Sequence, residues 1–212
     1  MKKLKFSLLG ILFLMPFCLM AQENRNWNTL YLQLNNFEFQ DSGSQNGGSI
    51  GYNKAFSLSP KTPLFLETGL GLQYCYDSAS LEINEFQSKI KFHLLSLKAP
   101  VNLVYRISFP NGKIHLLPFA GFTLRGNLIA KAKIKAKVGN LKEEKSINLF
   151  DDPANSEIEY NQFKRFQIGW NVGLNAEIGK HFVVGLSYGK DFNEIATGVK
   201  VATTSLTLGY RF

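Results

Sequence analysis

Four lysines stand at every second position of the segment AKAKIKAKV, residues 130–138, with Ala, Ile and Val between them. They are Lys131, Lys133, Lys135 and Lys137. A spacing of two places all four on one face of a β-strand, because successive side chains of a strand point to opposite faces. Such a row could bind an anionic partner, or it could be one face of a strand whose charges are balanced elsewhere in the chain.

Lipid modification is a second chemistry that the residue types allow, because a histidine beside a serine or a carboxylate can activate a nucleophile. The best candidate group consists of His93, Ser88 and either Glu82 or Glu85. The other two histidines fall far from His93 in the predicted architecture, so no shared triad emerges. The sequence also lacks the paired Cys or His spacing that is typical of a metal site. We therefore expect no enzymatic activity, no cofactor and no metal.

The N-terminus predicts export. Three lysines precede the apolar run FSLLGILFLMPFCLM, and Ala21 offers a cleavage point, which is typical of a secretory signal peptide over residues 1–21. The mature chain, residues 22–212, then has a formal charge of +5, since the whole chain has +8 and the signal peptide contains three lysines. Export and this moderate charge argue against a nucleic-acid partner. Cys75 remains as a single cysteine, which excludes an intramolecular disulfide.

Alternation of apolar and polar residues dominates the chain after residue 27, and this is the pattern of β-strands with two unlike faces. In FQIGWNVGLNAEIG, every second residue from Phe166 to Ile178 is apolar, and the residues between them are Gln, Gly, Asn and Glu. The alternation predicts eight strands, at residues 27–37, 48–58, 63–77, 92–109, 113–138, 157–179, 181–193 and 200–212.

The predicted connections alternate between short and long, which places the short turns at one end of the fold. This is the plan of an outer-membrane barrel. We therefore predict an all-β fold, an eight-stranded antiparallel up-and-down transmembrane β-barrel in the cell outer membrane, with periplasmic turns and extracellular loops. The strand at 113–138 exceeds the about 9–11 residues that a spanning strand needs, so we expect a long extracellular hairpin at about 130–165. Prolines disturb strand ladders, so we also expect a bulge or bend near Pro100 and Pro118.

The polar face distinguishes a membrane barrel from a soluble, lipocalin-like barrel, whose outer face would carry many charges. Here the polar face is rich in Gly, Ser, Asn and Thr, which suits a narrow lumen filled with side chains. Its few charges predict a salt-bridged network, with a path for protons or small ions as the alternative. These charges are Glu67, Lys98, Arg106, Arg125, Glu177 and Arg211. Aromatic residues near both strand ends of the apolar face are typical of membrane interfaces.

Two segments resemble a known family. LKAPVNLVYRI, a turn and LLPFAGFTLRG are similar to the middle hairpin of the PorT-like outer-membrane β-barrel family, and the resemblance covers roughly residues 27–212. The terminal TSLTLGYRF, with Tyr210 and Phe212, resembles the signature that outer-membrane barrels present to the barrel-assembly machinery. The resemblance implies contact with outer-membrane lipid and, because some members are linked to secretion, secretion components as candidate partners. It implies no catalytic residue.

The lysine row is then assigned by counting along its strand. Counted from Arg125, which faces the lumen, the four lysines fall on the inner side. Counted back from Gln167, Glu157 and Glu159 fall on the inner side of the next strand. Opposite charges at facing positions stabilise a strand pair by about 0.2–1 kcal/mol. We therefore favour a partly self-complementary charged hairpin, with contact to anionic surface polysaccharide or lipopolysaccharide as the alternative.

These observations favour a non-enzymatic outer-membrane barrel that displays extracellular loops for structural, adhesion or secretion-accessory roles. A lipid-modifying barrel enzyme is one alternative. A soluble barrel that binds a ligand in an apolar interior is the other.

Overall fold

The computed structural model describes residues 26–40, 43–59, 62–83, 86–109, 113–138, 141–153 and 160–212. Within these ranges the regular secondary structure is strand, and no described helix is long and apolar enough to cross a membrane. The strands are β1 (Trp27–Phe39), β2 (Gly43–Ser57), β3 (Leu64–Ile83), β4 (Phe86–Tyr105), β5 (Ile107–Ser108), β6 (Ile114–Val138), β7 (Leu141–Asn148), β8 (Phe166–Ile178), β9 (Phe182–Asp191) and β10 (Val201–Arg211). The predicted signal peptide, residues 1–21, lies outside the described residues.

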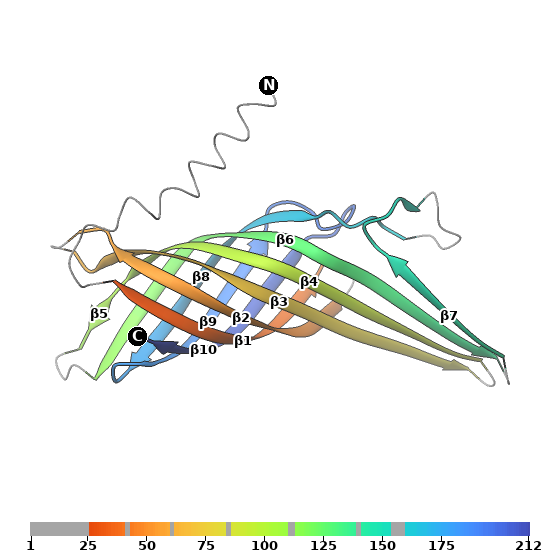
Figure 1. Ribbon diagram of the computed structural model, residues 1–212, viewed down its shortest axis with the longest axis horizontal. Coiled ribbons are helices and arrows are strands. Elements are labelled where there is room, and N and C mark those ends of the chain that lie inside the picture. Colours follow the sequence, from red (N-terminus) through yellow and green to blue (C-terminus); the bar gives the residue numbers. More distant parts are fainter. Residues whose placement is uncertain are drawn as a thin grey trace, which may run out of the picture.

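A closed ring is formed by β1, β2, β3, β4, β6, β8, β9 and β10, with each strand antiparallel to its neighbours (Figure 1). The first and last strands close it. Beyond their ladder, the amide N–H of Asn28 donates to the Phe212 carbonyl, and the Phe212 N–H donates back to the Asn28 carbonyl, both at 3.0 Å. The predicted eight-stranded antiparallel barrel is therefore confirmed.

Side chains alternate between the two surfaces of the ring as the sequence pattern predicts. On β1, Leu30, Leu32 and Leu34 point outward and are 51%, 58% and 68% exposed, whereas Tyr31 and Asn35 are buried in the lumen. The apolar surface thus lies outside and the polar surface inside. This is the reverse of the soluble, lipocalin-like alternative.

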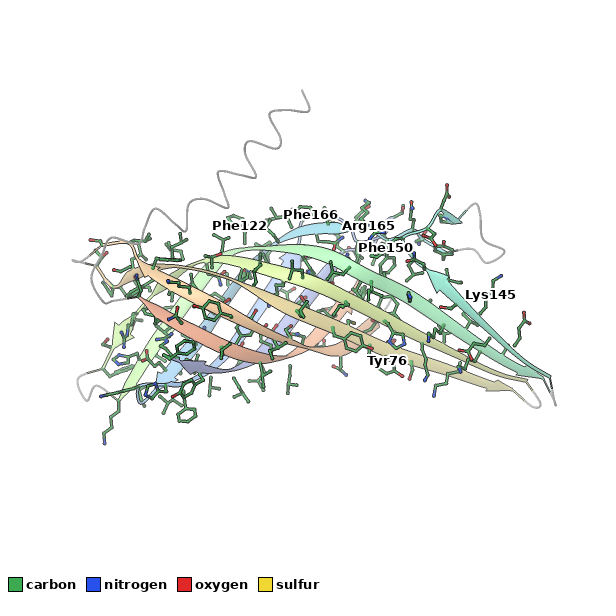
Figure 2. The ribbon with its side chains drawn as sticks, in the orientation of Figure 1. Tyr76, Phe122, Lys145, Phe150, Arg165 and Phe166 are labelled. Carbon is green, nitrogen blue, oxygen red and sulfur yellow. The ribbon has the colours of Figure 1, made fainter. Side chains whose placement is uncertain are left out.

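Aromatic side chains gather on the outer surface near both ends of the ring. Tyr74, Tyr76, Phe166, Tyr188 and Phe192 lie toward the end where the longer connections lie, which is called the long-loop end below. Tyr105, Phe109, Phe182, Tyr210 and Phe212 lie toward the other end, the short-turn end. All ten are exposed, and Figure 2 shows Tyr76 and Phe166 at the outer edge of the barrel. Two such belts mark where a bilayer's interfaces meet a barrel.

Three strands continue past the ring at the long-loop end and form a sheet with β7. We call this sheet, in the order β3, β4, β6 and β7, the extension (Figure 1). Beyond Lys131, β6 adds seven residues that pair with both β4 and β7, a length of roughly 23 Å at the usual rise of a strand. The strand therefore continues beyond the ring, as its length predicted.

The sequence misplaced several boundaries in this region. The connections QDSGSQNG and DSASLEINEFQSKI, residues 40–47 and 77–90, were predicted to be long loops, but β2 begins at Gly43, β3 ends at Ile83 and β4 begins at Phe86. Cross-strand pairing overrides their weak alternation. The strand predicted at 157–179 begins instead at Phe166, so the partner of β6 in the extension is β7. Glu157 and Glu159 lie outside the described residues.

One residue in β6 changes which side of the sheet its side chains face. Leu95 pairs with Ile129 and Ser96 pairs with Asn127, so Leu128 has no counterpart on β4. An extra residue of this kind is a β-bulge, and it reverses the alternation beyond it. Asn127 stabilises the bulge, since its side chain accepts from the Ser96 hydroxyl at 2.7 Å and donates to the Gln167 amide oxygen at 2.5 Å.

The bulge overturns the predicted orientation of the lysine row. Ala130 is fully buried, and Ala132 and Ile134 pack against the apolar cluster inside the long-loop end. Lys131, Lys133 and Lys135 therefore point outward, not toward the lumen. The ladder between β4 and β6 runs past Pro100, and that between β6 and β8 past Pro118, without a shift in register, so neither proline has the bulge expected near it.

Apolar clusters fill both ends of the lumen. At the short-turn end, Trp27, Phe65 and Leu117 are buried together with Ala55 and Val104. At the long-loop end the cluster combines strand residues with residues of the connections that follow β7 and β9. Its buried members are Phe37, Phe39, Cys75, Leu94, Ala130, Ile147, Leu149, Ile195, Ala196 and Val201. The polar middle of the lumen therefore has an apolar cluster on each side.

Cysteine labelling tests the reversal of β6. We predict that Lys133→Cys reacts with a membrane-impermeant maleimide in the folded, detergent-solubilised protein, whereas Ala132→Cys is protected by the apolar cluster. Unfolded protein should label in both variants, and the native Cys75, which is 1% exposed, should contribute little background. Protection of Lys133→Cys with labelling of Ala132→Cys would mean that the alternation from Arg125 is unbroken.

Candidate functional site

The lumen holds the predicted charge network, and Glu177 is at its centre. Arg211 donates to the Glu177 carboxylate at 2.5 Å, and Arg106 lies 3.3 Å from the same oxygen. The guanidinium of Arg211 also lies over the Trp27 ring, 4.2 Å from its centroid. Glu177 and Arg211 are almost fully buried, and Arg106 is partly exposed at the short-turn end. This group joins β8, β10 and the end of β4.

A second ion pair, between Arg125 and Asp191, lies in the lumen toward the long-loop end. Arg125 donates to the Asp191 carboxylate at 2.6 Å, and both side chains are buried. Asp191 was not among the predicted lumen charges. Alternation along β9 could have identified it, because Asp191 lies between outward-facing Lys190 and Phe192.

The two remaining predicted charges contact neutral groups. Glu67 accepts from the Asn53 amide at 3.2 Å, and Lys98 donates to the Gln33 side chain at 2.8 Å. They line a polar cavity of about 90 Å³ in the middle of the lumen. The structure thus places all six predicted residues in the lumen, cross-linking its walls. With the apolar clusters at both ends, this arrangement suits a structural core better than a path for ions.

The candidate catalytic residues do not come together. His93 shares a hydrogen bond of 2.7 Å with the Tyr74 hydroxyl on the outer surface. Ser88 precedes His93 by five residues on β4, which separates them by roughly 17 Å in a strand. Glu82 pairs with Gln87 at the tip of the extension, and Glu85 lies outside the described residues. Along β3 and β4 the structure therefore does not bring His93 together with Ser88 or Glu82.

The other two histidines lie at the short-turn end. His115 shares a hydrogen bond of 2.9 Å with Ser108, and Glu177 lies opposite His115 across the ladder of β6 and β8. Glu177, however, is held by two arginines. His181 contacts the Arg211 carbonyl at 2.8 Å and stacks on Tyr210. Among the described residues no cluster of His, Cys, Asp and Glu is arranged to hold a metal ion.

The outward lysines of β6 have basic neighbours on β4. Lys133 pairs with Lys91 and Lys135 with Lys89, so two like-charged pairs lie side by side. Sequence reasoning missed Lys89 and Lys91 because it assigned them to a loop, although they alternate in SKIKFH. We call Lys89, Lys91, Lys131, Lys133 and Lys135 the lysine face. Lys137 lies in register with Gln87 and Lys142 near the tip.

Glu144 of β7 is the acidic neighbour of the lysine face. Lys135 donates to its carboxylate at 2.7 Å. This hydrogen bond lowers the pKa of Glu144, so the ion pair forms at neutral pH and is lost as the pH falls through that lowered pKa. Both side chains are about half exposed, so the pair contributes little to stability.

Replacement of the central lumen carboxylate tests the network. We predict that Glu177→Gln lowers the stability of the folded barrel by about 3–5 kcal/mol, because it leaves buried arginine charge without its partner. The measurement is the urea midpoint of the mobility difference between folded and unfolded barrel in SDS gels. Glu144→Gln, which removes an exposed ion pair, is the matched control and should leave the midpoint unchanged. Equal midpoints for both variants would contradict a structural role for the network.

No curated protein matches the sequence, but solved structures of outer-membrane proteins are similar to this chain. A major outer-membrane protein from Thermus thermophilus is similar at 14% identity and a TM-score of 0.49, over 89% of this chain and 100% of that one. Ail, the attachment invasion locus protein of Yersinia pestis, is similar at 14% identity and 0.47, over 89% and 100%. Neisserial surface protein A is similar at 12% identity and 0.45, over 88% and 95%.

The family comparison covers almost the entire chain. The outer membrane protein beta-barrel domain family matches residues 9–212. This range includes all the strands of the ring, and the outward apolar band with its two aromatic belts is the surface that such a domain presents to lipid. The chain therefore belongs to the outer membrane protein beta-barrel domain family, as a membrane-spanning barrel of the outer membrane.

Proposed function

We propose that the protein is a non-enzymatic, sealed outer-membrane barrel that anchors the extension at the cell surface. The observation that carries the proposal is the contrast between its two parts. The lumen holds an apolar cluster toward each end, and buried ion pairs cross-link its walls. Three strands nevertheless continue beyond the ring. The barrel therefore serves as a base, and the extension is the part that meets a partner.

The long-loop end is extracellular in this proposal. Outer-membrane barrels keep short turns in the periplasm and longer elements outside, and the extension and the two longest connections, residues 149–165 and 192–200, lie at the same end here. Tyr210 and Phe212 are exposed at the opposite end, where the barrel-assembly machinery would meet the terminal strand. Adhesion and assistance to secretion are the two narrower roles that an exposed sheet would serve. Membership of the PorT-like family stays a prediction from the resembling segments.

Conductance is the first test. We predict that the purified barrel, inserted in a planar lipid bilayer in molar KCl, gives no stepwise current above the empty bilayer, because apolar clusters exclude hydrated ions at both ends. An open porin inserted under the same conditions is the positive control. Reproducible unitary steps would show that the lumen is an ion path and would overturn the sealed barrel.

Accessibility of the extension is the second test. The connection between β6 and β7 lies between Val138 and Leu141. We predict that an epitope inserted there binds its antibody on intact cells. The same epitope inserted between Phe109 and Lys113, at the short-turn end, should bind only after the outer membrane is permeabilised. The opposite result in the two variants would place the extension in the periplasm and contradict the proposal.

A further inference from the structure

The lysine face continues the outer surface of the barrel. His93 and Lys131 are paired on β4 and β6, and the next outward residues toward the membrane are Leu95 and Ile129. Tyr74 and Tyr76 flank them on β3. Along these strands the outer surface therefore changes from apolar residues, through an aromatic belt, to lysines. This is the order of hydrocarbon, interface and headgroup layers in a bilayer.

The facing lysines of β4 and β6 repel one another when no partner is bound. Lys91 lies directly opposite Lys133, and Lys89 lies directly opposite Lys135. Like charges at facing positions destabilise a strand pair. Among the side chains that the structure describes, Glu144 pairs with Lys135 at the edge nearest β7, and the Asp151 carboxylate is held by Asn148 beside Lys131. An anion bound from outside would relieve the repulsion across the rest of the face.

The polar residues beside the lysine face are suited to bind an oxyanion. Ser78 lies opposite Lys91 on one side, and Ser146 lies opposite Lys133 on the other, whereas the Asn148 amide opposite Lys131 already donates to the Asp151 carboxylate at 2.9 Å. Hydroxyl groups next to ammonium groups supply the hydrogen bonds that phosphate oxygens accept. The face thus offers two parallel columns of lysine with a serine on each side.

An apolar groove lies on the same outer surface, on the membrane side of the lysine face. It forms where Gly48 of β2, which has no side chain, stands between Leu34 and Tyr74. The groove has a volume of about 600 Å³, and Tyr74 and Leu95 line its edge toward the lysine face. A charged surface and an apolar groove that share an edge fit an amphiphile with an anionic head.

We infer that the lysine face binds the phosphate groups of a phosphorylated glycolipid in the outer leaflet of the outer membrane, with an acyl chain of that lipid in the Gly48 groove. The inference rests on the proposed function, because the extension must lie on the outer side of the membrane. It identifies the partner as a lipid of the protein's own membrane. Bound lipid would hold the extension against the membrane surface and neutralise its facing lysines.

Native mass spectrometry of the full mature barrel in detergent, titrated with diphosphoryl lipid A, tests the inference. The variant Lys91→Gln/Lys131→Gln/Lys133→Gln removes three charges from the face. Because each lysine beside an anionic lipid surface contributes roughly fivefold in affinity, we expect its affinity to fall at least about tenfold. The charge-matched control is Lys180→Gln/Lys190→Gln/Lys200→Gln, which lies off the face and should bind like the wild type. Both variants should keep the gel shift of a folded barrel.

Two further probes define the outcomes. Dephosphorylated lipid A should bind the wild type at least about tenfold more weakly than the diphosphoryl form, because the phosphates meet the lysines. Equal binding of diphosphoryl lipid A by the wild type and the face variant would overturn the inference. Selective binding of dextran sulfate, with no binding of lipid A, would also overturn it and assign the face to a soluble glycan. The epitope experiment separates these results from a failure of the proposed function, which would show the extension in the periplasm.

Discussion

Backbone polar groups inside a bilayer must find their hydrogen-bond partners within the protein, and the rest of this structure depends on that requirement. It forces the first strand to pair with the last, so β1 and β10 close a ring of eight strands. A ring of this size leaves a lumen only wide enough for side chains. The lumen therefore has to be packed like a core, and glycines make room where it is tightest: the hydroxyl of Tyr31 lies where Gly51 and Gly71 have no Cβ.

Packing a polar lumen then requires that its charges neutralise one another. Glu177 with Arg211 and Arg125 with Asp191 do so between strands that are distant in sequence. These buried pairs cost desolvation, and removing one partner costs more than the pair contributes. The Arg211 guanidinium also packs on Trp27 of the short-turn cluster, so the ion pairs and the apolar clusters together fix how the walls face each other.

Alternation in the sequence was sufficient to predict the fold, its outward apolar surface and the six lumen charges, because a period of two needs no knowledge of neighbouring strands. It was insufficient where neighbours decide the outcome. β7 and the outer halves of β3 and β4 form because the strands beside them continue, and their own patterns are weak. Asp191 was not predicted to face the lumen, although the alternation along β9 places it there. Leu128 was not predictable, since a bulge depends on the partner strand and on the hydrogen bonds of Asn127.

The bulge at Leu128 also has a meaning in genetic terms. Beyond Leu128, every side chain of β6 faces the side opposite to the one that it would face without the bulge. Gain or loss of a single codon at this place would exchange the two faces of the hairpin without one substitution in AKAKIKAKV. A descendant with that change would bury its lysines and expose its alanines, so its surface chemistry would differ entirely while its sequence there stayed the same.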